Sequence, residues 1–431
     1  IGAGTAGAMA IREFDDNPAS RNTAVCLIDD DPGKQGTRIR GVKVVGGRDM
    51  IAAAVKKYGV EEIIFCIPSA PISVRNEILE KCSIPGVALK TLPTLSQLAN
   101  GEVTLQQVKN VSIDDLLGRT QVCTDNSAMA DKVRGKTVLV TGGGGSIGSE
   151  LCRQIATHHP KRLIILDIYE NNAYNIEQEL KRKYHESLNL LTLVASVRDI
   201  GKMRDVFEKY RPQIVFHAAA HKHVPLMELS PAEAIKNNVF GTRNLLESAS
   251  AHGVERLVQL STDKAVNPTN VMGATKRITE MLIQRYGEKT NMKCMAVRFG
   301  NVLGSHGSVI PLMESQIRKG GPVTVTHPDI TRYFMTIPEA AQLVLDMGEP
   351  VRIMDLAKKL IRAYGYEPNV DMPIKIIGLR PGEKLYEELL MDSERDKMTR
   401  TAHKKIFVAN VDKIDDAQYD HMMQVLQTVE G

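Results

Sequence analysis

The stretch "TVLVTGGGGSIGSELCRQIA", residues 137–156, decides the fold. Its apolar start predicts a buried strand, its glycines a tight turn, and its remainder an amphipathic helix. The next apolar run, "RLIILD" at 162–167, ends at Asp167. Glycines that join a strand to a helix, with an acid at the end of the following strand, form the dinucleotide-binding fingerprint. The alternative is a strand–helix turn that holds no ligand.

The glycine turn supplies the candidate cofactor ligands of this fingerprint. Residues without a Cβ let a pyrophosphate approach the backbone, and the N-terminus of the helix offers N–H groups and positive potential. The candidates are Gly142, Gly145, Ser146, Ile147 and Gly148. The Asp167 carboxylate can hold a pair of ribose hydroxyls.

Four further apolar runs alternate with helical patterns after this unit. They are "LTLVAS" (191–196), "IVFHAAA" (214–220), "RLVQLST" (256–262) and "CMAVRFGNV" (294–302). Continuously apolar strands separated by helices predict a parallel sheet covered on both faces. The fold class is therefore α/β, with functional residues at the carboxyl ends of the strands.

The beginning of the chain repeats the same plan. "IGAGTAG" (1–7) precedes a helix, and "TAVCLIDDD" (23–31) ends in acids, so a second Rossmann-like unit is predicted, with or without a ligand. Because the first strand starts abruptly, we expect an N-terminal truncation. We predict a Rossmann-like domain at 1–99, a linker at 100–134 with one short helix, "SIDDLLG", and a catalytic domain at 135–431. The last of these ends in a small substrate-binding subdomain.

Composition narrows the class of protein. A chain of 431 residues with 43% apolar and 25% charged residues is typical of a globular protein with two or three domains. The net charge is +4 without a basic block, which argues against nucleic acid as a partner. Six cysteines without a CxxC pair favour a reducing cytosol over a disulfide framework or zinc site. A metal site at His217, His221 and His223 is a weaker alternative, because no carboxylate or cysteine completes it.

Seven motifs occur in order between residues 141 and 390. They are "TGGGGSIGSEL", "FHAAAHKHVPLME", "NNVFGT", "STDKAVNPTNVMGATK", "RFGNVLGSHGSVIP", "RYFMT" and "LRPGEKLYEELL". With them the second half resembles the extended short-chain dehydrogenases/reductases that act on nucleotide sugars. It is most similar to the CapD/PglF-type UDP-N-acetylglucosamine 4,6-dehydratases of bacterial surface-glycan pathways. The first half resembles the non-catalytic Rossmann-like domain of their long members, which transmembrane helices precede.

The resemblance implies a reaction and a place for it. Oxidation at the sugar C4 makes the C5 proton acidic; a base removes that proton, an acid protonates the C6 hydroxyl, water leaves, and the hydride returns to C6. UDP-N-acetylglucosamine is the implied substrate and NAD the cofactor. The long members imply attachment to the cytoplasmic face of the bacterial inner membrane, through a segment upstream of this sequence. We also expect a homo-oligomer. A C4 or C5 epimerase is the alternative enzyme, and a non-catalytic nucleotide-sensing protein is the alternative class.

By resemblance, Asp263 is the acid toward the C6 hydroxyl, Lys264 the base at C5, and Thr262 the ligand of the C4 oxygen. A basic role requires that the pKa of Lys264 be depressed by burial or by neighbouring positive charge. The alternative is a surface salt bridge between the two neighbours. We do not expect such a pair, because adjacent residues of an extended segment point in opposite directions.

Met272 and Lys276 lie one helical turn apart and can share a face. The wider superfamily has a tyrosine at the position of Met272, which accepts the C4 hydroxyl proton, and a lysine at that of Lys276, which binds the nicotinamide ribose. The methionine either packs in the core or marks the transfer of that proton to another group, most simply Asp263. Loss of the tyrosine argues against a simple C4 epimerase.

The remaining site residues also follow from the resemblance. For the cofactor they are Asp167 at the adenosine ribose, Asp199 and Ile200 at the adenine, and Ala218, Ala219 and Ala220 beside it. For the substrate they are Lys222 and His223 at the sugar, Asn301, Arg332 and Arg380 at the diphosphate, and Glu383 at the uridine ribose or on Arg380. Asn238 has either a scaffold or a functional role. NAD is favoured over NADP because a carboxylate repels a 2′-phosphate and no arginine directly follows Asp167.

One junction departs from the pattern. A helical stretch meets the strand-like "LDMGEPVRI" with no turn residue between Val344 and Leu345. Since a helix–strand connection usually needs about 2–6 residues, we expect roughly a dozen residues to be missing there.

Overall fold

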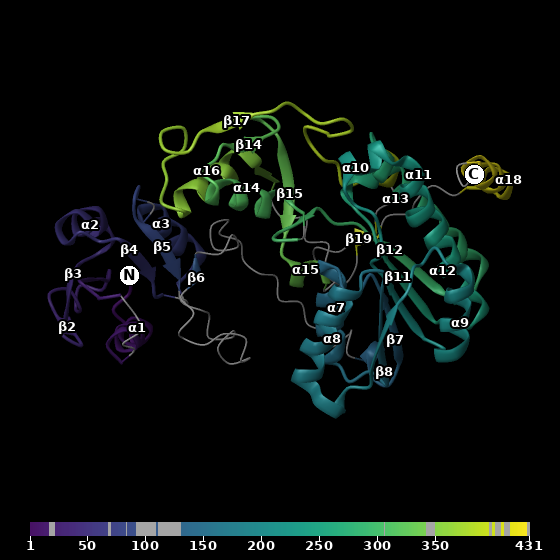
Figure 1. Ribbon diagram of the computed structural model, residues 1–431, viewed down its shortest axis with the longest axis horizontal. Helices are drawn as coiled ribbons and strands as arrows, with labels where there is room; N and C mark the ends of the chain where they lie inside the picture. Colours follow the sequence, from purple (N-terminus) through teal and green to yellow (C-terminus); the bar gives the residue numbers. More distant parts are fainter. Residues whose placement is uncertain are drawn as a thin grey trace. The chain divides into compact units, whose positions relative to one another are not determined.

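The computed structural model describes residues 1–16, 22–67, 70–82, 84–91, 109–110, 131–305, 307–341, 350–395, 399–400, 407–408 and 414–428. The chain forms two compact units (Figure 1). The first comprises Ile1–Thr120, Val309–Pro328 and Arg352–Ile377, and the second Gln121–Ser308, Asp329–Val351 and Gly378–Gly431. Most of the predicted linker at 100–134, with its short helix, and the Val344–Leu345 junction lie outside the described residues. The predicted domain boundaries stay a prediction.

The second unit is built on a six-stranded, fully parallel sheet with the order β12-β11-β10-β7-β8-β9. Its strands are β7 (Thr137–Thr141), β8 (Arg162–Asp167), β9 (Leu190–Val194), β10 (Ile214–His217), β11 (Arg256–Leu260) and β12 (Lys293–Val297). The order reverses between β7 and β10, as in the Rossmann fold, and ligands of such sheets bind at the carboxyl ends of the strands beside this point. The predicted α/β class with a doubly wound parallel sheet is confirmed, as are its six strands.

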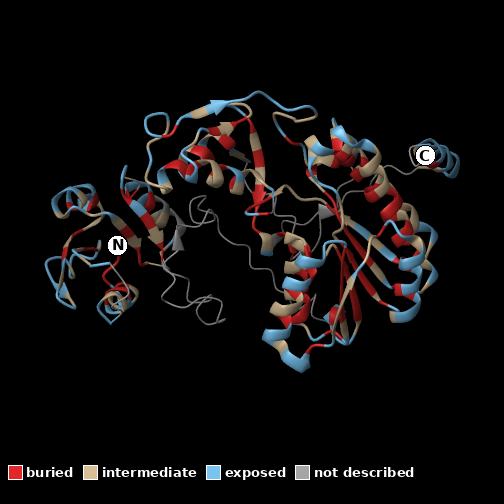
Figure 2. Ribbon diagram, in the orientation of Figure 1, coloured by how far each residue is buried: buried red, intermediate tan, exposed pale blue. Residues whose placement is uncertain are grey.

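Helices cover both faces of this sheet. They are α7 (Ser146–Ala156) and α8 (Glu170–Tyr184) on one face, and α9 (Ile200–Tyr210), α12 (Gly241–Ala251) and α13 (Val271–Lys289) on the other. Val138 and Val140 of β7 face the core under α7 and α8. Leu139, between them, faces the core under α9, α12 and α13. Figure 2 shows the strands buried and the helices exposed on their outer sides. Burial on both faces explains why the central strands are mostly apolar, as at residues 138–140 and 163–166.

Shorter elements complete the second unit. They are η2 (His185–Ser187), α10 (Val224–Leu229), α11 (Pro231–Ala234), a π-helical segment (Ile235–Phe240), η4 (Asp263–Ala265), β13 (Asn301–Val302), β15 (Thr331–Met335), α15 (Ile337–Ala341), β16 (Pro350–Arg352), α17 (Asp392–Arg395), β18 (Thr399–Arg400), β19 (Phe407–Val408) and α18 (Asp416–Gln427). β13 pairs in parallel with β15. This pairing brings Asn301 and Arg332 to the same side of the unit as the turn that follows β11.

The first unit is a smaller α/β body. Its elements are α1 (Thr5–Asp16), β1 (Leu27–Ile28), β2 (Arg38–Ile39), β3 (Val42–Gly46), η1 (Arg48–Met50), α2 (Ile51–Tyr58), β4 (Glu62–Phe65), α3 (Ile72–Cys82), β5 (Ala88–Thr91), β6 (Lys109–Asn110), α14 (Val309–Arg318), β14 (Val323–Val325), α16 (Ile353–Ala363) and β17 (Ile374–Ile376). The backbone of Ile1 and Gly2 forms hydrogen bonds with the backbone of Ile64, Cys66 and Ile28, as the backbone of a central strand would. In the described part of the chain, each helix is too short or too polar to span a bilayer.

Candidate active site

The glycine turn after β7 leaves no room for side chains. Gly142 has φ +66°, and a Cβ there would lie 2.6 Å from the backbone nitrogen of Ala219. A Cβ on Gly148 would lie 2.0 Å from the Gly142 carbonyl oxygen. Gly145 is the N-cap of α7 and has no side chain to occupy the first turn, where Ser146 and Ile147 begin the helix. The turn therefore has the close-packed backbone and open helix N-terminus that bind a pyrophosphate.

The Asp167 carboxylate at the end of β8 fixes this turn. One oxygen accepts the N–H of Gly144 at 2.9 Å, and the other accepts the N–H of Tyr169 at 2.9 Å. Asp199 caps α9 by accepting the N–H of Lys202, and Ile200 begins that helix. Ala218 continues β10 by donating its N–H to the Thr141 carbonyl, and Ala219 and Ala220 follow it. These candidate cofactor residues thus lie at the carboxyl edge of the sheet, whereas Lys276 lies in helix α13.

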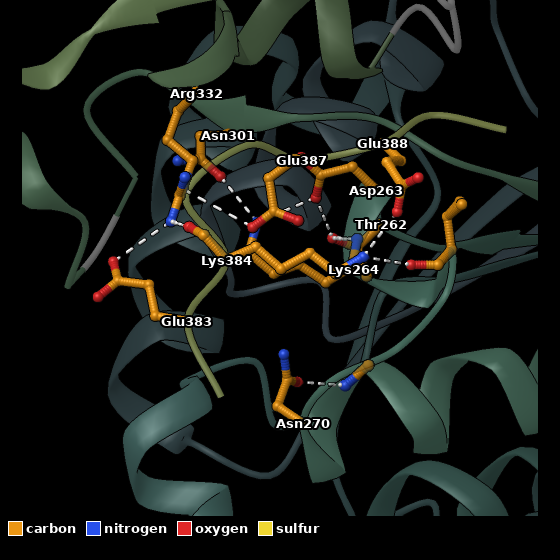
Figure 3. A network of polar contacts seen from close by, with 12 residues as sticks. Thr262, Asp263, Lys264, Asn270, Asn301, Arg332, Glu383, Lys384, Glu387 and Glu388 are labelled. Carbon is orange, nitrogen blue, oxygen red and sulfur yellow. Dashed lines mark hydrogen bonds and ion pairs between the residues drawn. The ribbon is translucent and has the colours of Figure 1, made fainter. Parts of the chain in front are cut away.

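The acid–base turn, residues 262–265, follows β11. Thr262 caps the short 3-10 helix by accepting the N–H of Lys264, and Asp263 is completely buried. One carboxylate oxygen of Asp263, Oδ1, accepts hydrogen bonds from the Thr262 hydroxyl and the Lys264 ammonium, both at 2.9 Å (Figure 3). Our expectation that the neighbours do not pair is wrong. The chain turns into a 3-10 helix here, where successive side chains lie about 120° apart instead of on opposite faces.

Lys264 lies between two carboxylates. Its Nζ also donates to Oδ1 of Asn301 at 3.1 Å and lies 3.6 Å from Oε1 of Glu387. Burial favours the neutral amine, but the charges of Asp263 and Glu387 outweigh it and hold the pKa of Lys264 above its ordinary value. The depressed pKa that we expected from the sequence is therefore not found here. The pKa of Lys264 is raised by Asp263 and, in addition, by Glu387, a buried acid from a distant part of the chain.

Arg332 on β15 is buried and engaged by the protein. It donates to the carbonyls of Thr331 and Lys384, lies 3.3 Å from Glu383, and its Nε lies 3.7 Å from Oε1 of Glu387. The guanidinium that was predicted to bind a diphosphate thus holds the 383–387 segment in place.

Arg380 remains half-exposed. It lies 3.4 Å from Glu383 across a turn in which Gly382 has φ +74°. Glu383 consequently contacts both Arg332 and Arg380. Lys222 and His223 are exposed as whole residues after β10. Neighbouring protein still shields the ionisable end of each side chain from part of the solvent, and this desolvation lowers the pKa of both.

Helix α13 presses its first turn against the acid–base turn. Asn270 caps it by accepting the N–H of Gly273, and a Cβ on Gly273 would lie 2.2 Å from the Lys264 carbonyl oxygen. Met272 is buried in an apolar cluster with Met227 and Ala234, as its packing interpretation predicts. Lys276 is buried on the same helix, and the loss of solvation, opposed by Glu280, lowers its pKa to about 8.

Polar residues behind the site have scaffold roles. Asn238 accepts the N–H of His221 and donates to the His221 carbonyl and the Thr275 hydroxyl, so it ties the loop after β10 to α13. His217 lies inside the sheet with its two ring nitrogens on Thr141 and Thr242. Burial beside the Lys276 charge lowers the pKa of His217 to about 3. The three histidines of "HAAAHKH" therefore face different surroundings.

Glu387 is the site residue that the sequence did not identify. Its motif, "LYEELL", contains two adjacent acids, and no periodicity distinguishes the buried one from its exposed neighbour.

Comparison with known proteins gives the family. A family model described as "Polysaccharide biosynthesis protein" matches residues 138–411. The chain is 48% identical to the probable polysaccharide biosynthesis protein EpsC of Bacillus subtilis, over 91% of this chain and 68% of the relative. It is 46% identical to the capsular polysaccharide biosynthesis protein CapD of Staphylococcus aureus, over 99% and 73%.

Among solved structures, Pen from Bacillus thuringiensis is 30% identical with a TM-score of 0.58, covering 68% of this chain and 98% of that one. The resemblance to CapD-type proteins is thereby confirmed over most of the chain. We conclude that the chain belongs to the polysaccharide biosynthesis protein family.

Proposed function

We propose that the chain is an NAD-dependent UDP-N-acetylglucosamine 4,6-dehydratase. Membership of its family places it among enzymes that modify nucleotide sugars for glycan biosynthesis. One observation carries the finer assignment: a buried acid, Asp263, and a partly buried base, Lys264, share a hydrogen bond at the end of β11. Beside them, buried Met272 stands where an epimerase of this superfamily would need a tyrosine. The site therefore has proton-transfer groups for water loss and lacks the usual one for simple oxidation.

The turn after β7 fits NAD. Gly142 and Gly148 admit no Cβ, so the backbone N–H groups at the start of α7 are accessible to a pyrophosphate, and Asp167 stands at the end of the next strand for a ribose. When bound, NAD supplies the chemistry of taking a hydride from C4 and returning it at C6. Lys276 would hold its positive charge at the nicotinamide ribose.

Thr262 and Asp263 provide a route for the O4 proton. The Thr262 hydroxyl donates to Asp263 at 2.9 Å, so it can accept the sugar O4 proton while it passes its own to the carboxylate. This relay replaces the absent tyrosine. Asp263 then carries the proton that the C6 hydroxyl needs in order to leave as water. The proton arrives on Oδ1, the carboxylate oxygen that the Thr262 hydroxyl contacts, so Oδ1 is the oxygen that passes it to the C6 hydroxyl.

Lys264 provides the base at C5. Before the reaction its ammonium releases a proton to the solvent. The neutral amine takes the C5 proton once C4 is a ketone and gives it back to C5 after water has left. The proton count closes: one proton moves from O4 through Asp263 to the departing hydroxyl, and one leaves C5 and returns. No external oxidant or reductant is needed.

The substrate would bind through residues around this turn. We assign Lys222 and His223 to the sugar and Arg380 to the diphosphate, because its guanidinium is half-exposed and can pair with phosphate oxygens. Asn301, whose side-chain oxygen contacts Lys264, would bind the diphosphate from beside the acid–base turn. Arg332 and Glu383 would act by holding the 383–387 segment.

The place of action and the assembly are also proposals. We propose that the enzyme acts at the cytoplasmic face of the bacterial inner membrane, as its resemblance to the long family members implies. Fractionation of cells that express the full-length protein tests this location. A homo-oligomer is tested by light scattering during size-exclusion chromatography.

Product mass tests the function. Incubation with UDP-N-acetylglucosamine should give a product lighter by one water, with no net formation of NADH. A double variant, Asp263→Asn with Lys264→Met, is the control and should give none. An isomer of unchanged mass would instead identify an epimerase and refute the proposal.

A further inference from the structure

Glu387 is a buried acid at the centre of the polar network around the acid–base turn. Its side chain is 3% exposed, and Oε1 lies 3.6 Å from Lys264 and 3.7 Å from Nε of Arg332 (Figure 3). The other oxygen, Oε2, is buried without a hydrogen-bond partner in the described part of the chain. Since an unpaired buried charge is costly, a carboxylate is retained here only if its neighbours need its charge.

The charged groups around Lys264 come from three elements. Asp263 lies on the same short helix, Arg332 on β15, and Glu387 on the 383–388 segment. From that segment Glu383 faces Arg332, while Lys384 pairs with Glu388 and donates to the Val266 carbonyl. Asp263 and Glu387 are thus the carboxylates that face the lysine ammonium.

The order of proton transfers gives these two carboxylates different tasks. This step rests on the proposed function. Lys264 becomes charged when it takes the C5 proton, and at that moment Asp263 already holds the O4 proton and is neutral. Glu387 is then the carboxylate left to stabilise the new ammonium. We propose that Glu387 is a positioning residue, which holds the Lys264 amine toward C5 and stabilises its charge while the C5 proton is on it.

The direction of the effect follows from the charge. Glu387 raises the pKa of Lys264, because it favours the ammonium. Without this charge Lys264 is a weaker base. Its titration then moves to lower pH by about 1–3 units, the range for removing one close opposite charge.

Competitive acetylation measures this titration directly. Traces of acetic anhydride modify only neutral amines, and mass spectrometry of the peptide that contains Lys264 gives the pH at half-maximal modification. The comparison uses Glu387→Gln, which removes the charge and keeps the shape, and Glu387→Asp, which keeps the charge on a shorter side chain. Glu388→Gln is the matched control, because that residue is half-exposed and pairs with Lys384 instead.

The expected result is a midpoint shifted downward by at least one unit in Glu387→Gln, by less in Glu387→Asp, and not at all in Glu388→Gln. In turnover, the acidic limb of the Glu387→Gln pH profile should move to lower pH. On the plateau above that limb, where Lys264 is neutral in both proteins, kcat should be about 10- to 100-fold lower than in the parent, with KM little changed. An unmoved midpoint in Glu387→Gln overturns the proposal; if that variant does not fold, an unmoved midpoint in Glu387→Asp does so. If no nucleotide sugar is dehydrated but the midpoint shifts, the proposed function fails and the control of Lys264 by Glu387 stands.

Discussion

Substitution Gly273→Ala perturbs the contact between helix α13 and the acid–base turn. A Cβ at this position would lie 2.2 Å from the Lys264 carbonyl oxygen and 3.2 Å from Oδ1 of the capping Asn270. The closest ordinary contact between a carbon and a carbonyl oxygen is about 3.3 Å, so the two segments must separate by about 1 Å.

The size of the effect follows from this displacement. Misplacing a catalytic group by about 1 Å costs on the order of 100-fold in rate, and overpacking costs about 1–3 kcal/mol of stability. Gly287→Ala is the matched control, because it makes the same change in the same helix. Its Cβ would lie 3.3 Å from the Cβ of Cys294, which needs a shift of only a few tenths of an ångström.

Urea unfolding and initial rates of product formation measure the two effects. Gly273→Ala should lose about 1–3 kcal/mol in the free energy of unfolding and about 100-fold in kcat. Gly287→Ala should keep its activity and lose no stability, since alanine is favoured over glycine in a helix by about 1 kcal/mol. The reasoning is refuted if Gly273→Ala retains kcat within a few-fold of the parent, or if both variants behave alike.

Three further changes probe the site. Gly148→Ala should abolish retention of NAD, read by chromatography of the denatured protein, because its Cβ would lie 2.0 Å from the Gly142 carbonyl oxygen; full retention would contradict the assigned site. Lys276 loses its charge as pH rises through its lowered pKa of about 8. NAD retention should therefore weaken above that pH in the parent and not in Lys276→Met, and a parent profile that stays flat would exclude this role. Thr262→Val should lower kcat about 100-fold or more by removing the proton relay, while unchanged turnover would assign the O4 proton to another path.

The sequence predicts the second unit well for a physical reason. Strands buried on both faces have apolar residues at consecutive positions, so the centres of "TVLVT" and "RLIILD" are visible as strands without tertiary information. The glycine turn is equally local, since Gly142 and Gly148 are required by contacts within a few residues or across one strand.

The ion pairs and pKa shifts of the site could not be predicted from local sequence patterns. Whether Asp263 and Lys264 face each other depends on the 3-10 turn, which forms where β11 ends and α13 packs. The pKa of Lys264 depends on Asp263 and on Glu387, and Glu387 reaches it only through the fold of the distant 383–388 segment. The motif around Arg332 predicts a ligand of phosphate. Its contacts with Glu383 and with backbone carbonyls form only in the folded chain, so the sequence does not show them.

A substrate labelled with deuterium at C4 tests the central claim most directly. We predict that UDP-N-acetylglucosamine with this label gives a product lighter by one water and with deuterium on C6, located by mass spectrometry and NMR. That result requires oxidation at C4, loss of water and return of the same hydride to C6. A product of unchanged mass with deuterium still on C4 would contradict the account and identify an epimerase.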